Sequence, residues 1–286
     1  MRVLVLGANG MLGCSVFRVL SESSNIVTFG TVRDESSKRF FNKSIAKRLL
    51  TGINVEQKDS LEQAFSRTCP DVVINCIGII KQLADVSNPL QVISINALLP
   101  HRLAHLCELS NVRLIHISTD CVFDGDKGDY TESDSFDAKD MYGITKYLGE
   151  VSYPHAVTLR TSIIGHELQS KHSLVDWFLS QEADCKGYTK AIFSGVPTVV
   201  LTMIIRDIVI PHTELSGVYH VAAKSISKYD LLKLIAEVYE KSVQITSDDS
   251  LVVDRSLNAD KFHAATGYVP PEWPELIQMM HDYKQH

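Results

Sequence analysis

A short aliphatic run followed by three spaced glycines, at the start of the chain, constrains the fold most strongly. Residues 3–6 read VLVL, which is typical of a strand buried on both faces, and residues 11–20 follow with a helical apolar pattern. Between them the glycines take the spacing G-x-x-G-x-x-G, one residue longer than the usual G-x-G-x-x-G. A turn of this kind lets backbone N–H groups and the positive helix end approach a pyrophosphate, where a Cβ would collide with it. We therefore expect a dinucleotide there, held by Gly7, Asn9, Gly10, Met11 and Leu12.

Arg33 is the first charged residue after a second predicted strand, residues 26–30, and Asp34 follows it. In a dinucleotide fold the end of this strand faces the adenosine ribose. An acidic residue there accepts from the 2′-hydroxyl, and an arginine binds a 2′-phosphate. Charge-assisted hydrogen bonds contribute roughly 1.5–3 kcal/mol each. Arg33 therefore favours NADPH over NADH, with NADH and a merely solvated loop arginine as the alternatives.

Strands and helices alternate along the first half of the chain. Further strands are predicted at residues 71–77, 112–118 and 157–161, with helices at 60–67 and 89–109 between them. This alternation indicates an α/β fold, a Rossmann-type doubly wound parallel sheet.

The alternation loosens after about residue 166, which indicates a small C-terminal substrate lobe. The predicted elements there are a helix at 173–181, loop and short strand at 191–200, helix or turn at 208–212, a strand at 217–222 and a helix at 227–240. We assign residues 1–165, joined by parts of 196–222, to an NADP-binding Rossmann domain and 166–286 mainly to the substrate lobe. The junction has no Pro/Gly/Ser-rich linker, so we expect a fixed cleft.

Charge and cysteine content exclude several classes of protein. The 286 residues include 28 basic and 34 acidic side chains, so no global basic field attracts nucleic acid or an acidic membrane. No apolar stretch approaches the ~20 residues of a membrane span, and no signal peptide is evident. The six cysteines contain no C-x-x-C pair and indicate reduced thiols in a cytoplasmic protein.

The polar residues that carry chemistry follow the strand predicted at 112–118. It runs into Ser118, Thr119 and Asp120; Tyr142 comes 23 residues after Thr119, and Lys146 lies one helical turn further on the same face. A phenol has a pKa of about 10, and a nearby ammonium favours its ionised form. The lysine can also hold the nicotinamide ribose, while Thr119 or Ser118 hydrogen-bonds a carbonyl oxygen that gains charge. The pattern predicts a hydride-transfer enzyme with Tyr142 as proton donor.

The spacing Tyr-x-x-x-Lys occurs a second time, at Tyr229 and Lys233. That pair lies in the amphipathic helix predicted behind Ser227, with no hydroxylated strand end before it. We interpret it as an ordinary packing-and-surface pair.

No metal site is expected. The acidic segment 124–137 has Asp129 and Ser135 where an EF-hand starting at Asp124 needs glycine and glutamate. His101 and His105 are one helical turn apart, but no third ligand is suggested.

Five motifs resemble those of the extended short-chain dehydrogenase/reductase family, most of all its dTDP-4-dehydrorhamnose reductase branch: LGANGMLG, VINCIG, SINALLPHRLA, ISTDCVFDG and MYGITKYLGE. The resemblance is strong over residues 1–165 and looser beyond. It implies NAD(P)H binding, reduction of a 4-keto nucleotide sugar for surface polysaccharide, and Thr119, Tyr142 and Lys146 as the catalytic triad. It further implies that the cofactor is lined by Asn75, Cys76 and Gly78, that Asn96 supports the site, and that Asp120 contacts the sugar.

Cys121 departs from the rhamnose-pathway pattern, which has tyrosine after Ser-Thr-Asp. With the segments SLVDWFLSQ, FSGVPT and DRSLNADKF, it resembles relatives that act on UDP-linked 2-acetamido sugars. Both UDP-2-acetamido-4-ketohexose and dTDP-4-dehydrorhamnose therefore remain candidate substrates. Arg255 is the expected diphosphate partner, Arg160 is either a second one or a structural ion pair, and Trp177 is either core or a sugar platform.

Two other functions fit the same fold. One is a nucleotide-sugar epimerase or dehydratase that holds NAD tightly, against which Arg33 argues. The other is a non-catalytic regulatory subunit, against which the intact Thr119, Tyr142 and Lys146 argue. A homodimer is compatible with each of these interpretations.

Overall fold

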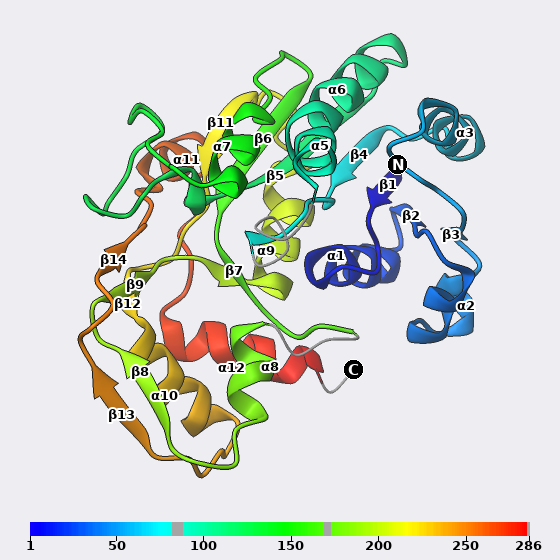
Figure 1. Cartoon of the computed structure of the whole chain (residues 1–286). Helices are drawn as coiled ribbons and strands as arrows, with labels where there is room; N and C mark the ends of the chain where they lie inside the picture. The colour runs from blue at the N-terminus through cyan, green and yellow to red at the C-terminus, as the bar shows by residue number, and fades with distance from the viewer. Residues whose placement is uncertain (82–87, 169–172, 285–286) are drawn as a thin grey trace.

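A seven-stranded parallel sheet forms the centre of the protein (Figure 1), as seen in a computed structural model that describes residues 1–81, 88–168 and 173–284. Its strand order is β11-β6-β5-β4-β1-β2-β3, and every neighbouring pair is parallel. The strands are β1 (Arg2–Leu6), β2 (Val27–Thr31), β3 (Leu49–Leu50), β4 (Val72–Asn75), β5 (Arg113–Thr119), β6 (Ala156–Thr161) and β11 (Gly217–His220). The predicted Rossmann-type sheet is confirmed.

Helices cover both faces of this sheet because its central strands are buried on both sides. Val3 and Val5 of β1 face one apolar cluster, and Leu4 and Leu6 face the other. The first face carries α1 (Met11–Glu22) and α9 (Thr198–Ile204), which is extended by a π-helical turn, Ile205–Val209. The second face carries α3 (Lys58–Thr68), α5 (Pro89–Val92), a π-helical segment (Ile93–Leu98) and α6 (Leu99–Leu109). The last three form the single helix predicted over 89–109.

The other elements near the sheet are short helices and 3-10 turns. They are a 3-10 turn at Glu35–Phe40, α2 (Lys43–Ala46), a 3-10 turn at Asp120–Val122, α7 (Met141–Leu148) and α11 (Asp260–Thr266).

The C-terminal part of the chain builds a small lobe beside the sheet (Figure 1). It contains three small sheets, β10-β7, β12-β9-β14 and β13-β8. Their strands are β7 (Ile163–Ile164), β8 (Cys185–Tyr188), β9 (Ala191–Phe193), β10 (Val196–Pro197), β12 (Ile226–Ser227), β13 (Ile245–Asp248) and β14 (Val253–Asp254). The helices of the lobe are α8 (Leu174–Leu179), α10 (Lys228–Val238) and α12 (Trp273–Lys284).

The lobe and the sheet share one hydrophobic core. Val3 and Val5 belong to the same buried cluster as Phe178 of α8, Leu231 of α10 and Ile277 of α12. Separating the lobe from the sheet would expose this apolar surface to water, at roughly 25 cal/mol per Å². Burial of this shared apolar surface therefore holds the lobe and the sheet in one arrangement.

The prediction of loop and short strand for residues 191–200 is only partly right. Strands β9 and β10 are present, but α9 begins at Thr198 and continues the segment as a helix. The β-branched residues 198–200 favour a strand by propensity. Burial overrides that preference, because the helix packs against α1, where Thr202 Oγ1 lies 3.1 Å from Ser15 Oγ.

The helices and the cysteines have one further property each. None of the helices in the described ranges has the length and apolar character needed to cross a membrane. All six cysteines carry free thiols.

Candidate active site

The three glycines of the first turn are required for three different reasons. Gly7 has φ +79°, in the left-handed region that glycine adopts readily. A Cβ on Gly13 would lie 2.1 Å from the Gly7 carbonyl oxygen, so Gly13 lets α1 pack tightly on the turn. Gly10 is exposed, and a Cβ there would meet only the same oxygen, at 3.5 Å. Among the described residues no neighbour of Gly10 excludes a Cβ, and an exposed glycine at the N-cap of α1 allows a ligand to approach the backbone closely.

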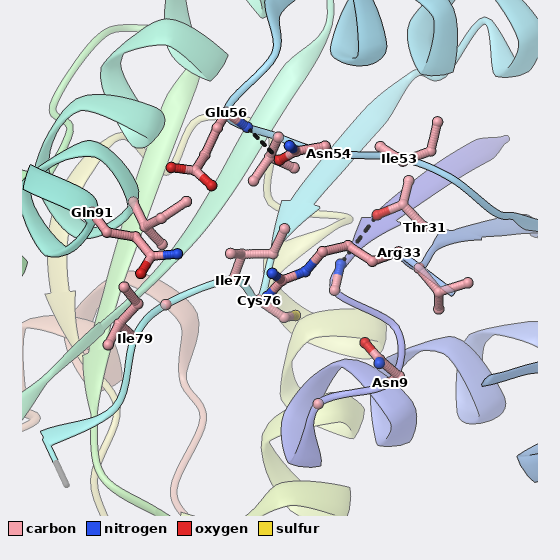
Figure 2. A pocket seen from close by; sticks show the side chains of 16 residues that line it. Asn9, Thr31, Arg33, Ile53, Asn54, Glu56, Cys76, Ile77, Ile79 and Gln91 are labelled. Carbon is pink, nitrogen blue, oxygen red and sulfur yellow. Dashed lines mark hydrogen bonds between the residues drawn. The ribbon is translucent and has the colours of Figure 1, made fainter. Parts of the chain in front are cut away.

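A pocket of about 220 Å³ opens at this turn, at the carboxyl ends of β1, β2 and β4 (Figure 2). This edge of a doubly wound sheet is where ligands bind. The lining residues are Gly7, Asn9, Gly10, Thr31, Val32, Arg33, Ile53, Asn54, Val55, Glu56, Cys76, Ile77, Gly78, Ile79, Gln91 and Ile95.

Six of the residues expected at the cofactor line this pocket: Gly7, Asn9, Gly10, Arg33, Cys76 and Gly78. Met11, Leu12 and Asn75 do not. The Leu12 side chain is buried in the core beneath α1. The Asn75 amide is used inside the protein, since Nδ2 lies 3.1 Å from His116 Nδ1 and Oδ1 accepts from Ile77 N at 3.1 Å. Asn75 therefore shapes the loop that lines the pocket, without contributing to its surface.

The loop after β3 supplies pocket residues that the sequence did not indicate. Ile53, Asn54 and Glu56 lie on the side of the pocket opposite Asn9 (Figure 2), and Val55 of the same loop also lines it. The Asn54 side chain accepts from Glu56 N at 3.1 Å, which fixes the turn. Strand β3 has only two residues, too few for a periodic signal, so nothing in the sequence placed this loop at the sheet edge.

Arg33 extends from the end of β2 into the pocket (Figure 2). Its side chain is exposed, and its guanidinium donates no hydrogen bond to any of the residues that the structure describes. Its donors are therefore available to an anion.

Lys146 is buried next to the pocket. Its side chain is 5% exposed, and Nζ donates to the Ile117 carbonyl at 2.7 Å. A Cβ on Gly78 would lie 3.9 Å from Nζ, so the ammonium adjoins the pocket wall. Burial lowers the pKa of Lys146 to about 8. The negative charge of Glu150 raises this pKa, but by less than burial lowers it.

Tyr142 stands in the first turn of α7, which Asp140 caps by accepting from Gly143 N at 2.7 Å. Burial raises the pKa of the phenol far above its usual value, and hydrogen bonding to the Thr119 side chain lowers it by less. Burial and the charge of Cys121 raise this pKa more than the Thr119 hydrogen bond lowers it, while Lys146 Nζ donates to the Ile117 carbonyl. Tyr142 is thus a protonated phenol at neutral pH, as a proton donor must be.

Thr119 and Asp120 follow β5 directly and interact with each other. Thr119 Oγ1 donates to Asp120 Oδ1 at 3.1 Å and accepts from Cys121 N at 3.2 Å. Asp120 is buried, which raises its pKa, while the side chains of Cys121, Thr119 and Ser162 and the charge of Arg255 lower it. Burial also raises the pKa of the Cys121 thiol to about 12, so the thiol stays protonated.

Ser118 and Arg160 are committed to a buried ion pair. Ser118 Oγ donates to Glu150 at 2.7 Å, Arg160 donates to the same carboxylate at 2.9 and 2.5 Å, and Arg160 Nη1 lies 2.9 Å from His220 Nε2. Arg160 is 4% exposed. Of the two roles left open for Arg160, the structure supports the ion pair, and the Ser118 hydroxyl is bound to the same carboxylate.

Arg255 and Trp177 come from the lobe. Arg255 Nε donates to the Phe123 carbonyl at 2.7 Å, and its charge lowers the pKa of Asp120, Cys121 and Asp140. Trp177 is 39% exposed on α8, which excludes a core position.

The second Tyr-x-x-x-Lys pair lies on α10 of the lobe, and His101 lies on α6. Lys233 is exposed, and its Nζ lies 5.3 Å from the centre of the half-buried Tyr229 ring. His101 contacts Tyr153 and the Leu148 carbonyl. Across the described ranges no three His, Cys, Asp or Glu side chains gather as metal ligands.

Asn96 lies in the π-helical segment and supports the loop beside the pocket. Its Oδ1 accepts from Ile79 N at 2.8 Å, and its Nδ2 donates to Ile79 O at 3.1 Å. A Cβ on Gly149 would lie 2.0 Å from the Asn96 carbonyl oxygen, so this helix and α7 pack in direct backbone contact.

Two curated proteins similar to this chain along most of its length are reductases by name. A probable low-salt glycan biosynthesis reductase of Haloferax volcanii is 27% identical over 271 residues, covering 91% of this chain and 85% of that protein. A dTDP-4-dehydrorhamnose reductase of Aggregatibacter actinomycetemcomitans is 24% identical over 309 residues, covering 99% of each.

Solved structures share the fold. A dTDP-4-dehydrorhamnose reductase of Clostridium acetobutylicum has a TM-score of 0.80 at 22% identity, covering 100% of both chains. One from Bacillus anthracis, in complex with NADP, has a TM-score of 0.78 at 22% identity, covering 99% of both.

The predicted resemblance to the dTDP-4-dehydrorhamnose reductase branch is confirmed by these relatives and by a family model. That model, described as RmlD substrate binding domain, matches residues 1–284, the lobe as well as the Rossmann sheet. The chain belongs to the RmlD substrate binding domain family.

Proposed function

We propose that this protein is an NADPH-dependent reductase of a 4-keto-6-deoxy nucleotide sugar in glycan biosynthesis. The observation that carries the proposal is that Tyr142 and Thr119 meet beside Lys146, whose ammonium adjoins the dinucleotide pocket. A proton donor, a hydroxyl for the carbonyl oxygen and a cation for the ribose are thus grouped at one sheet edge. The names of the relatives and the NADP complex of a structural neighbour support the same reaction class.

The residues of the pocket fit NADPH. The exposed turn at Gly10 and the start of α1 would receive the pyrophosphate, and Arg33 would bind the 2′-phosphate. Lys146 would hold the nicotinamide ribose. When bound, the cofactor supplies the hydride that reduces the C4 carbonyl.

Tyr142 and Thr119 complete the reduction. Thr119 Oγ1 donates its one proton to Asp120 in the structure described, and on substrate binding it would turn that proton to the C4 oxygen, which becomes more negative as hydride adds to the carbon. Tyr142 then transfers its phenolic proton to that oxygen, so the ketone gains one hydride and one proton and leaves as an alcohol. The high pKa of the phenol keeps this proton in place until the oxygen becomes basic.

Cys121 favours a UDP-2-acetamido-4-ketohexose over dTDP-4-dehydrorhamnose. It lies beside Asp120, where the rhamnose-pathway pattern has the larger tyrosine, and it leaves room for an acetamido group with one hydroxyl donor fewer. NADPH oxidation should therefore be about tenfold or more faster with the UDP substrate, and Cys121→Tyr should remove that preference. The test is kcat/KM for both substrates with both proteins. Equal or better rates with the dTDP sugar would assign the protein to the rhamnose pathway.

Arg33→Ala should shift the cofactor preference. If the guanidinium binds the 2′-phosphate, the variant should lose NADPH efficiency and retain NADH efficiency, changing their ratio about tenfold or more. The measurement is kcat/KM with each cofactor. Arg67→Ala, at an exposed arginine near the end of α3 that lines no part of this pocket, is the matched control. An unchanged ratio would show that Arg33 is only a surface residue.

The alternatives give different results in the same assays. An epimerase or dehydratase would retain NAD through dialysis and show no net NADPH oxidation. A regulatory subunit would show no turnover with any keto sugar. The homodimer, the cytoplasmic location, the lack of nucleic-acid or membrane partners and the role of Trp177 as a sugar platform stay predictions.

A further inference from the structure

Arg255 is fixed beside the catalytic residues by contacts from both lobes. Its Nε donates to Phe123 O at 2.7 Å, and the preceding residue, Asp254, donates its N–H to Gly125 O at 2.7 Å. A Cβ on Gly125 would lie 2.5 Å from Val253 and 3.1 Å from Arg255 Cγ, so the two segments are in direct contact. Tyr130 N also donates to Ser256 O at 2.8 Å. Arg255 therefore has a defined position, although it comes from the C-terminal lobe.

The guanidinium has unused donors. The Nη groups of Arg255 form no hydrogen bond with any residue in the described ranges, although the side chain is half-buried. Asp140, one of the carboxylates whose pKa Arg255 lowers, is already paired with Lys81 at 2.6 Å. A half-buried arginine with free donors, held by Phe123 O at the end of the turn that begins with Asp120, is suited to a polar group of the substrate.

The position of Arg255 argues against its expected role as a diphosphate partner. In a nucleotide sugar the diphosphate is attached at C1, across the ring from the C4 carbonyl. Asp120 is hydrogen-bonded to Thr119, which faces that carbonyl in the proposed reaction. Arg255 Nε donates to Phe123 O, and Phe123 N donates to Asp120 O at 3.0 Å, so Arg255 is held at the turn that begins with Asp120. In the proposed reaction this turn is closer to the keto carbon than to the diphosphate.

We propose that Arg255 and Asp120 form a donor–acceptor pair that recognises the hydroxyl group on the carbon next to the keto carbon. The hydroxyl would donate to the Asp120 carboxylate and accept from an Arg255 Nη group, while Thr119 and Tyr142 take the neighbouring carbonyl oxygen. This assignment rests on the proposed reductase function. It makes Arg255 a specificity-determining residue for α-hydroxy ketones, a feature that both candidate sugars share at C3.

The test compares two substrates that differ only in this hydroxyl: a 4-keto-6-deoxy nucleotide sugar and its 3-deoxy analogue. The unsubstituted protein should prefer the hydroxylated ketone by about 100-fold or more in kcat/KM, because a site built to bind a hydroxyl rejects an analogue that lacks it. Arg255→Met should lower kcat/KM for the hydroxylated ketone at least tenfold and reduce the preference, with NADPH affinity unchanged. Arg255→Lys should recover part of the kcat/KM for the hydroxylated ketone and part of the preference for it over the 3-deoxy analogue.

Arg206→Met is the matched control, since Arg206 bonds only to the adjacent Asp207 among the described residues. Equal rates of the unsubstituted protein on both ketones would overturn the inference, and so would an equal loss on both in Arg255→Met. The first comparison needs no variant, so a folding defect in Arg255→Met cannot obscure it. No NADPH oxidation with either ketone would overturn the proposed function itself, which is a different outcome.

Discussion

Tyr142→Phe is expected to lower kcat for ketone reduction by about 10²–10⁴, the range typical of a lost general acid. The phenyl ring fills the same space but has no proton to transfer to the C4 oxygen. NADPH affinity should remain nearly unchanged, because the hydroxyl faces Thr119 and the substrate. Steady-state kinetics with the keto sugar and a fluorescence titration with NADPH measure the two effects separately.

Tyr229→Phe is the control for this experiment. Tyr229 and Lys233 have the same spacing as Tyr142 and Lys146, but Tyr229 is half-buried against β8 and Lys233 is exposed on α10. Its kcat should equal that of the unsubstituted protein. If Tyr142→Phe kept most of its activity, the proton donor would have to be another residue.

Lys146→Met should reduce both kcat and NADPH affinity. Loss of a charge-assisted hydrogen bond to the ribose corresponds to a fall in affinity of about 10–100-fold. Catalysis should fall as well, because in the proposed reaction the same ammonium positions the cofactor beside Tyr142. Lys233→Met, which removes the other lysine of the repeated spacing, should change neither quantity.

The pH dependence of NADPH binding should report the same lysine. Burial lowers the pKa of Lys146 to about 8, so the ammonium is present below that pH and is lost above it. NADPH affinity should therefore weaken as the pH rises past about 8, and this dependence should be absent in Lys146→Met. The effect of Lys146 on folding stability runs in the opposite direction to its effect on NADPH affinity. Between pH 8 and the ordinary lysine pKa of 10.5, the unfolded chain holds a proton on this lysine that the folded protein has lost. The free energy of unfolding contributed by Lys146 therefore increases with pH over this range. Affinity that did not change across this range would exclude contact between the ammonium and the cofactor.

The sequence by itself determined the frame of the protein. The buried run before Gly7, the glycine turn and the alternation of strands and helices predicted the parallel sheet, because fully buried strands and positive-φ glycines leave strong local signals. The spacing of Thr119, Tyr142 and Lys146 was readable for the same reason. The separation of Tyr142 and Lys146 by one helical turn, the polar residues at the end of a strand and the Ser227 cap of α10 each depend on residues that are close together in the chain.

Only the tertiary structure decided which polar residues face one another. Asn75 and Cys76 are adjacent in sequence, yet one is enclosed against His116 and the other lines the pocket. Arg160 and Arg255 looked alike as cations, but burial commits the first to Glu150, whereas the second donates only its Nε–H, to Phe123 O, among the residues that the structure describes. The two-residue strand β3, and the helix α9 formed by β-branched residues, depend on neighbours far along the chain. Contacts between distant segments set the burial and hydrogen-bond partners of these residues, and local sequence patterns carry no record of such contacts.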